Sequence, residues 1–262
     1  MITNRSDTSS SIDSNIISEV YPLSNGEILF YTSDHEFDST SDDYASSSGS
    51  NFMSQLGADL GNTSQNGVAQ LTVFIHGLDS PWDSAYSTLG KYSQRLNESG
   101  YQGMVVGFSW PSYGEASSGL FYSDSYLPSS DSLTIRNNIR GSEEAFSNML
   151  DTLFSLKDGS YGYDSLCVNI VAHSEGNYML LRGMNYIDTL ANPLQGNHLD
   201  QIIMMAADIN NGALDTPACQ QNVNGASGDG GAIAEHARFV TFYYSSHDVD
   251  LQVSGDVYKT YH

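Results

Sequence analysis

The chain has 262 residues, of which 39% are hydrophobic, and this is enough to bury the core of one large globular domain. Nine lysines and arginines stand against 31 aspartates and glutamates, so the formal net charge at pH 7 is −22. Such a surface repels phosphate backbones and anionic lipid head groups, so we expect neither nucleic acid nor an anionic membrane as a partner. An acidic surface also keeps a protein hydrated at high salt, and we expect either a halophilic host or a plain acidic protein.

The N-terminal segment, residues 1–18, is polar and serine-rich, which predicts disorder. It lacks the apolar stretch of a secretory signal, and no part of the chain approaches the roughly 18 apolar residues of a membrane helix. We therefore expect a cytoplasmic protein, with secretion by a signal-independent route as the alternative. Two cysteines, Cys167 and Cys219, do not make a disulfide framework, and we interpret them as a small buried side chain and a free thiol.

A hairpin is predicted for residues 19–33, because two β-rich runs flank the pair Asn25-Gly26, which adopts positive φ at low cost. Residues 34–51 follow as an acidic, serine-rich segment without an apolar period. Its carboxylates lack the spacing of calcium ligands, so we interpret the segment as a solvated loop or insert rather than a calcium site.

From residue 71 onward, short apolar runs alternate with segments of helical period. Runs that are apolar without alternation are typical of parallel strands buried on both faces. The pattern predicts strands at 71–77, 103–111, 166–174, 200–210 and 237–248, helices at 84–100, 132–157 and 176–190, and loops at 111–130 and 211–235. Gly141 could interrupt the longest helix. This order predicts an α/β fold, with a mostly parallel central sheet and helices on both faces.

The stretch AHSEG, residues 172–176, joins a predicted strand to a predicted helix. It matches the nucleophile elbow Gly-x-Ser-x-Gly, with alanine at the first glycine position. The residues two before and two after the serine must be small, because the strained turn brings neighbouring backbones close together. We therefore predict that Ser174 is a nucleophile at the carboxyl end of its strand, the alternative being that Ser174 only caps the helix.

Acyl transfer through a serine also needs two N–H donors for the oxyanion. We expect one from the backbone of Glu175, at a helix start where the dipole favours negative charge. The other is expected from the backbone of Leu78, in the loop after strand 71–77. His76 is interpreted as structural, through hydrogen bonds within this loop. His173 should point away from the serine, and we interpret it as a residue that either supports the site without touching substrate or serves packing.

Five stretches occur in order between residues 71 and 255: VFIHG, GFSWPSYG, IVAHSEGNYMLL, MMAADIN and FYYSSHDVDL. Together they resemble the α/β-hydrolase superfamily, and more narrowly a bacterial branch catalogued as a domain of unknown function. The resemblance does not cover residues 1–50, but we predict one α/β-hydrolase domain over residues 19–262 that contains the insert 34–51. The resemblance implies the nucleophile and oxyanion donors given above, with Asp248 as the acid and Asp208, one strand earlier, as the alternative acid.

The base that would activate Ser174 is harder to identify. A serine hydroxyl is a poor nucleophile unless a base removes its proton, and neutral imidazole suits this near pH 7. In the resembling fold, the histidine follows one further strand beyond the acid. His262 comes after Asp248 but is terminal, and His247 would give the triad Ser174–Asp208–His247. Both are weak candidates, and our leading interpretation is that these 262 residues lack the last strand and its histidine.

These features predict a serine hydrolase, carboxylesterase-like or lipase-like, that acts on a small-molecule or lipid ester without a cofactor or metal. The alternative is a non-catalytic or truncated binding module on a hydrolase scaffold, which the acidic insert and the missing base favour. Aromatic side chains near the loop 111–130 could line an acyl pocket or lid, or could serve ordinary loop packing. They are Phe108, Trp110, Tyr113, Phe121, Tyr122 and Tyr126.

Overall fold

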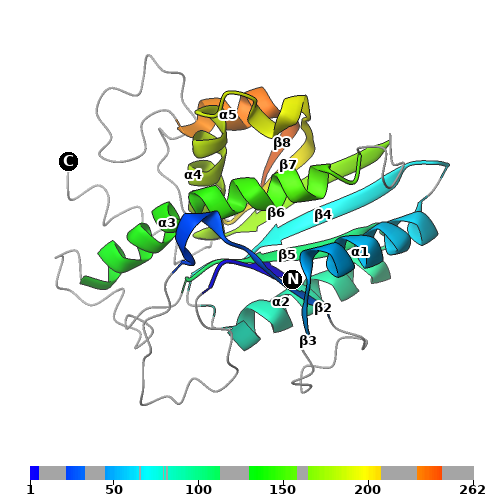
Figure 1. Ribbon diagram of the computed structural model, residues 1–262, viewed down its shortest axis with the longest axis horizontal. Coiled ribbons are helices and arrows are strands. Elements are labelled where there is room, and N and C mark those ends of the chain that lie inside the picture. The colour runs from blue at the N-terminus through cyan, green and yellow to red at the C-terminus, as the bar shows by residue number, and fades with distance from the viewer. Residues whose placement is uncertain are drawn as a thin grey trace.

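The computed structural model describes residues 1–5, 22–32, 45–64, 66–78, 80, 82–112, 130–157, 165–207 and 229–243. Within these ranges, eight strands form one sheet in the order β3-β2-β1-β5-β4-β6-β7-β8 (Figure 1). The strands are β1 (Ile2–Thr3), β2 (Leu29–Thr32), β3 (Ala45–Ser47), β4 (Ala69–Ile75), β5 (Met104–Ser109), β6 (Leu166–His173), β7 (Leu199–Met205) and β8 (Ala237–Tyr243). The helices are α1 (Gly49–Thr63), α2 (Trp82–Glu98), α3 (Ser130–Phe154), α4 (Gly176–Asp188) and α5 (Asp229–His236), with 3-10 turns η1 (Ser24–Gly26) and η4 (Pro193–Gly196).

The sheet is mostly parallel, as the alternation of strands and helices predicts. β1, β5, β4, β6, β7 and β8 pair in parallel, and only β2 and β3 run antiparallel to their neighbours. The carboxyl ends of the parallel strands therefore lie along one edge of the sheet, where open α/β sheets bind ligands. None of the helices in the described ranges has the length and apolarity to cross a membrane.

The central strand β4 is buried on both faces of the sheet, which explains its continuous apolar run. Leu71, Val73 and Ile75 point to one face and join the larger core cluster, which includes residues of α1, α3, α4 and α5. Phe74 points to the other face and joins a smaller cluster with Leu89 of α2. Burial on both faces removes the polar alternation of a half-exposed strand.

β1 lies inside the sheet, although the polar composition predicts disorder for residues 1–18. Ile2 is fully buried, and it pairs with Phe108 of β5 on one side and Phe30 of β2 on the other. A strand of two residues does not show in a composition averaged over the whole segment, so the prediction is wrong for residues 1–5. Residues 6–18 lie outside the described ranges.

The hairpin predicted over residues 19–33 forms only in part. Asn25 and Gly26 have positive φ angles of 58° and 65°, as the predicted turn requires. They belong to the 3-10 turn η1, however, and β2 pairs with β1 instead of with the run before the turn. Pro22, in that run, makes a single antiparallel bridge with Arg5. The long-range pairing with β1 thus replaces the local pairing that the sequence favours.

Regular structure lies in parts of two segments that the sequence predicts as loops. β3 and the first three residues of α1 fall within residues 34–51, and α5 begins within residues 211–235 and ends at His236. α1 contains glycine, serine and asparagine, which are weak helix formers. Its signal is the four-residue spacing of Phe52, Leu56 and Leu60, all of them buried. Packing of this apolar face, more than local propensity, stabilises the helix.

α3 runs through Gly141 without the interruption that the sequence allows there. A Cβ atom at Gly141 would lie 2.7 Å from Cγ of Pro22. Glycine at this position therefore lets the middle of α3 pack directly against the segment that precedes β2.

Gly183 of α4 provides a test of how closely α3 and α4 pack, because a Cβ atom there would overlap the Phe146 ring of α3. We expect Gly183→Ala to lower the free energy of unfolding by about 1–3 kcal/mol, since overpacking forces the two helices apart. Gly231→Ala in α5 is the control, because a Cβ atom there meets nothing within 4 Å. It should be neutral or stabilising by up to about 1 kcal/mol. Urea unfolding measures both variants, and equal effects at the two positions would contradict this packing.

Candidate active site

Ser174 lies in the centre of the sheet edge, where β6 ends between β4 and β7 and the chain turns into α4. Its φ angle is 52°, in the left-handed region that residues with a side chain rarely adopt. The Ser174 N–H donates a hydrogen bond of 3.0 Å to the carbonyl of Met205, at the end of β7. Ser174 is only half-buried. The turn therefore has the strained backbone of an elbow and keeps the serine in reach of solvent.

The small residues on either side of Ser174 are required by the surrounding backbone. A Cβ atom at Gly176 would lie 2.5 Å from the carbonyl oxygen of His76 and 2.8 Å from that of Ile75. No side chain fits there, because β4 passes directly against the first turn of α4. Ala172, two residues before Ser174, is fully buried. The geometry thus accounts for both small positions of the elbow motif.

Asn177 stabilises the turn through three hydrogen bonds, a role that its sequence context does not predict. Its Nδ2 atom donates hydrogen bonds to the carbonyls of Ser174 at 2.9 Å and Met205 at 3.1 Å. Its backbone N–H also donates to the Ser174 carbonyl, at 2.9 Å. Asn177 is fully buried, and a polar residue on the apolar face of a helix is the signal that could have identified it. Its Oδ1 atom has no hydrogen-bond partner.

The loop that begins at Gly77 faces Ser174. A Cβ atom at Gly77 would lie 3.0 Å from Cβ of Ser174 and 3.1 Å from the carbonyl oxygen of His173. Leu78 follows immediately, and within the described ranges no group accepts a hydrogen bond from its N–H. Glu175 follows Ser174 in the chain and occupies the N-cap of α4. Both predicted oxyanion amides therefore belong to backbone that adjoins the Ser174 side chain.

His76 has the structural role that the sequence predicts. Its Nε2 atom lies 3.3 Å from the Trp110 N–H and 3.2 Å from Nη2 of Arg5, and both of these groups can only donate. Nε2 is therefore the acceptor, and Nδ1 carries the ring proton and donates to the Gly77 carbonyl at 2.8 Å. Burial, and secondarily the Arg5 charge, lowers the pKa of His76 to about 3. A neutral imidazole with both nitrogens engaged cannot accept the Ser174 proton.

Of the two roles predicted for His173, packing is excluded, because the residue is exposed at the end of β6. Its Nδ1 atom lies 3.4 Å from the position that a Cβ atom at Gly77 would take, the same position that Ser174 Cβ approaches. An exposed imidazole thus lies beside the loop that faces the serine.

The predicted acid and base residues lie outside the described ranges: these are Asp248, Asp208, His247 and His262. Within the described ranges, no histidine nitrogen is hydrogen-bonded to the Ser174 hydroxyl. Of the aromatic residues for which the sequence leaves an acyl pocket and ordinary packing open, Phe108 and Trp110 are fully buried, so these two have the packing role. Phe108 stacks edge-on against Phe146, and the Trp110 indole donates to the His76 carbonyl. Tyr113, Phe121, Tyr122 and Tyr126 are not among the described residues.

Two hollows of about 550 and 570 Å³ open on the described surface, and neither is lined by Ser174 or Leu78. The first is bounded by η1 and α3, and the second by α1, α2 and the start of β5. We therefore assign no substrate to either hollow.

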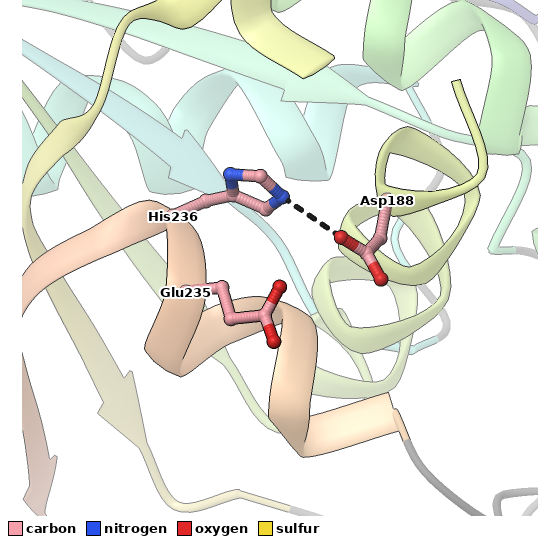
Figure 2. A group of neighbouring side chains, drawn as sticks. All are labelled: Asp188, Glu235 and His236. Carbon is pink, nitrogen blue, oxygen red and sulfur yellow. Dashed lines mark hydrogen bonds and ion pairs between the residues drawn. The ribbon is translucent and has the colours of Figure 1, made fainter. Parts of the chain in front are cut away.

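Another group of polar side chains lies at the far end of α4, where α5 packs against it. Nε2 of His236 lies 3.2 Å from Oδ1 of Asp188, with Glu235 beside them (Figure 2). One ligand atom from each side chain lies within 4.8 Å of the others, a spacing that suits a cation. The 13-residue helix α4 places this group about 20 Å from Ser174. We assign it to the contact between the two helices and not to the candidate active site.

Comparison with known proteins gives one match. The family model described as Alpha/beta hydrolase of unknown function (DUF900) matches residues 50–261. No curated protein and no solved structure matches the chain significantly. The matched range contains Ser174, Leu78 and Glu175, and it begins after the three strands β1, β2 and β3.

The left-handed turn can be tested without any assay of activity. Ser174→Gly and Ser174→Ala both remove the hydroxyl, but only glycine adopts a φ of 52° without a steric cost. We expect the glycine variant to be more stable than the alanine variant by about 1 kcal/mol in thermal unfolding. The same pair at Ser93, inside α2, should show the opposite order, because alanine is the better helix former. If Ser174→Ala were more stable than Ser174→Gly, the left-handed turn at Ser174 would be refuted.

The buried His76 should make the stability of the protein sensitive to acid. The unfolded chain binds a proton at His76 near pH 6.5, whereas the folded protein binds it only near pH 3. Stability therefore falls as the pH falls from 6.5, by about 1.4 kcal/mol per pH unit from this group. We expect His76→Gln to reduce the slope of unfolding free energy against pH by that amount between pH 6 and 4. Parallel curves for the two proteins in urea unfolding would count against a neutral, buried His76.

Proposed function

The chain belongs to the family of alpha/beta hydrolases of unknown function, and we propose that it is a serine hydrolase that cleaves ester bonds through Ser174. The observation that carries this proposal is the strained turn at Ser174, with φ of 52°, whose side chain lies against Gly77. A strained residue persists only where the surrounding structure holds it, and such residues concentrate at functional sites. A serine that only capped α4 would not need a left-handed conformation.

In the proposed reaction, the Ser174 hydroxyl attacks the ester carbonyl carbon while a base takes its proton. The carbonyl oxygen becomes an oxyanion and accepts hydrogen bonds from the backbone N–H groups of Leu78 and Glu175. The C–O bond to the alcohol then breaks, the alcohol leaves with the proton, and the acyl group remains on Ser174. Water attacks this acyl-enzyme in the same manner and releases the acid.

The position of Ser174 at the start of α4 supports this role electrostatically. The helix has 13 residues, and its N-terminal N–H groups carry partial positive charge. This end of the helix therefore favours the negative charge that develops on the substrate oxygen.

For the remaining members of the triad, we propose Asp248 as the acid, with Asp208 as the alternative. His247 and His262 stay the candidates for the base. We propose a neutral small-molecule or lipid ester as the substrate, because a net charge of −22 repels anionic esters from the surface.

A second function is favoured by one observation, which is that no described histidine is hydrogen-bonded to the Ser174 hydroxyl. On this alternative, the chain is a non-catalytic binding module on the hydrolase scaffold. The two functions differ in whether the serine hydroxyl is activated.

A fluorophosphonate probe, which reacts with activated serines, distinguishes the two functions. We expect the wild-type protein to be labelled at Ser174 and to hydrolyse p-nitrophenyl acetate. Ser174→Ala should abolish the labelling and lower kcat/KM at least about 1,000-fold. Ser99→Ala, at an exposed serine just after α2, should change neither. Absence of both labelling and hydrolysis in the wild type between pH 6 and 9 would favour the binding module.

A further inference from the structure

Arg5 lies behind the loop that carries the predicted oxyanion donor Leu78. It follows β1, which pairs in parallel with β5, so the chain delivers it to the same edge of the sheet as Ser174. Its side chain is buried, with the whole residue only 1% exposed. Arginine is almost never fully buried unless its charge is paired, so this position calls for a specific reason.

The guanidinium of Arg5 bonds the chain on both sides of Leu78. Its Nη2 atom donates to the carbonyl of Ser80, at 2.5 Å, and to Nε2 of His76, at 3.2 Å. Its Nε atom donates to the hydroxyl of Ser109, at 2.8 Å, which anchors the side chain on the end of β5. One planar group thus joins His76, which precedes Gly77, to Ser80, which follows Leu78 in the chain, and guanidinium geometry suits such a fork.

The partners of the Arg5 side chain among the described residues are neutral. Two serines and a neutral histidine surround the guanidinium, and within the described ranges no carboxylate lies in ion-pair distance of it. Burial lowers the pKa of Arg5 to about 9, so the group stays charged at neutral pH. A buried cation without a counter-charge is costly. Among the described residues the fold offers this cation no carboxylate, in a chain with only nine lysines and arginines.

The contacts of Arg5 lead directly to the candidate active site. Arg5 bonds His76, whose carbonyl oxygen lies against Gly176 at the first turn of α4. The next residue, Gly77, lies against the Ser174 side chain. A shift of the loop would therefore move the Leu78 N–H relative to Ser174.

We propose that Arg5 is a positioning residue, which holds the Leu78 N–H toward Ser174 and supplies a buried positive charge behind the oxyanion that forms there. This inference rests on the proposed hydrolase function and extends it to β1. Arg5 lies outside residues 50–261, so the family match does not include it.

The first test needs no activity. Nuclear magnetic resonance can follow hydrogen exchange of the Trp110 backbone and indole N–H groups, which donate to His76, in the wild type and in Arg5→Gln. We expect exchange of these two groups to become at least about 10-fold faster in the variant, while the Ile202 amide in β7 stays unchanged. Arg95→Gln removes the same charge from an exposed site on α2 and is the matched control. We expect it to leave exchange of the two Trp110 N–H groups and of the Ile202 amide unchanged. Unchanged exchange at Trp110 in Arg5→Gln would overturn the loop-holding role.

The second test separates positioning from general stability. If the wild type is labelled at Ser174, we expect Arg5→Gln to lower kcat for p-nitrophenyl acetate about 10- to 100-fold, with KM changed less than about 2-fold. A phenylboronic acid, which mimics the tetrahedral intermediate, should bind Arg5→Gln more weakly by the same factor. Arg5→Lys keeps the charge but not the planar fork, and should recover part of the loss. Arg95→Gln should match the wild type in kcat and in boronate binding.

The outcomes separate the two proposals. If the wild type is neither labelled nor active, the hydrolase function is refuted, and so is the catalytic role of Arg5. The exchange measurement still decides whether Arg5 holds the loop at Leu78. If the wild type is active and the kcat of Arg5→Gln lies within 2-fold of the wild-type kcat, the positioning role alone is overturned. The same holds if Arg5→Gln changes only KM. If Arg5→Gln does not fold, Arg5→Lys is compared with the wild type in its place, with the same readouts and a smaller expected loss. A kcat and boronate affinity in Arg5→Lys equal to those of the wild type would then overturn the dependence on guanidinium geometry.

Discussion

The central constraint in this structure is the left-handed conformation of Ser174, through which β6 turns into α4. For a residue with a Cβ atom, this conformation costs on the order of 1–2 kcal/mol. It persists because hydrogen bonds hold it on both sides. The Ser174 N–H bonds the end of β7, and Asn177 bonds the Ser174 carbonyl through both its side chain and its backbone. Gly176 contributes by having no side chain, since β4 occupies the space where one would lie.

The parallel sheet turns this local constraint into a site. β4, β6 and β7 are neighbours, and their carboxyl ends meet at one edge, so the loop after β4 reaches the serine at the end of β6. Behind this edge lies a buried polar layer in which Arg5 and Trp110 both bond His76. Satisfied buried polar networks are rigid, because each member that loses its partner pays a desolvation penalty. The loop at Gly77 therefore rests on a stiff support, which suits backbone donors that must be oriented before a reaction begins.

The described buried residues behind this edge of the sheet differ in charge from the molecule as a whole. The net charge is −22, yet the described residues behind the loop include an arginine and no carboxylate in ion-pair distance. Surface charges are weakened by water and salt, whereas a buried cation acts through a medium of lower dielectric constant. The buried layer behind the loop at Gly77, as far as the structure describes it, therefore carries a positive charge within a strongly acidic protein.

The sequence by itself determined the features that depend on near neighbours in the chain. The apolar runs at 71–77 and 166–174 predicted the buried parallel strands, and Ala172, Ser174 and Gly176 predicted the elbow, because strand burial and tight turns follow from residues a few positions apart. Only the tertiary structure decided the features that depend on distant partners. β1 is a strand because Ile2 pairs with residues of β2 and β5, and Arg5 is buried because it bonds residues 71 to 104 positions away. Local composition carries no record of such contacts, because they form only when the folded sheet brings the segments together.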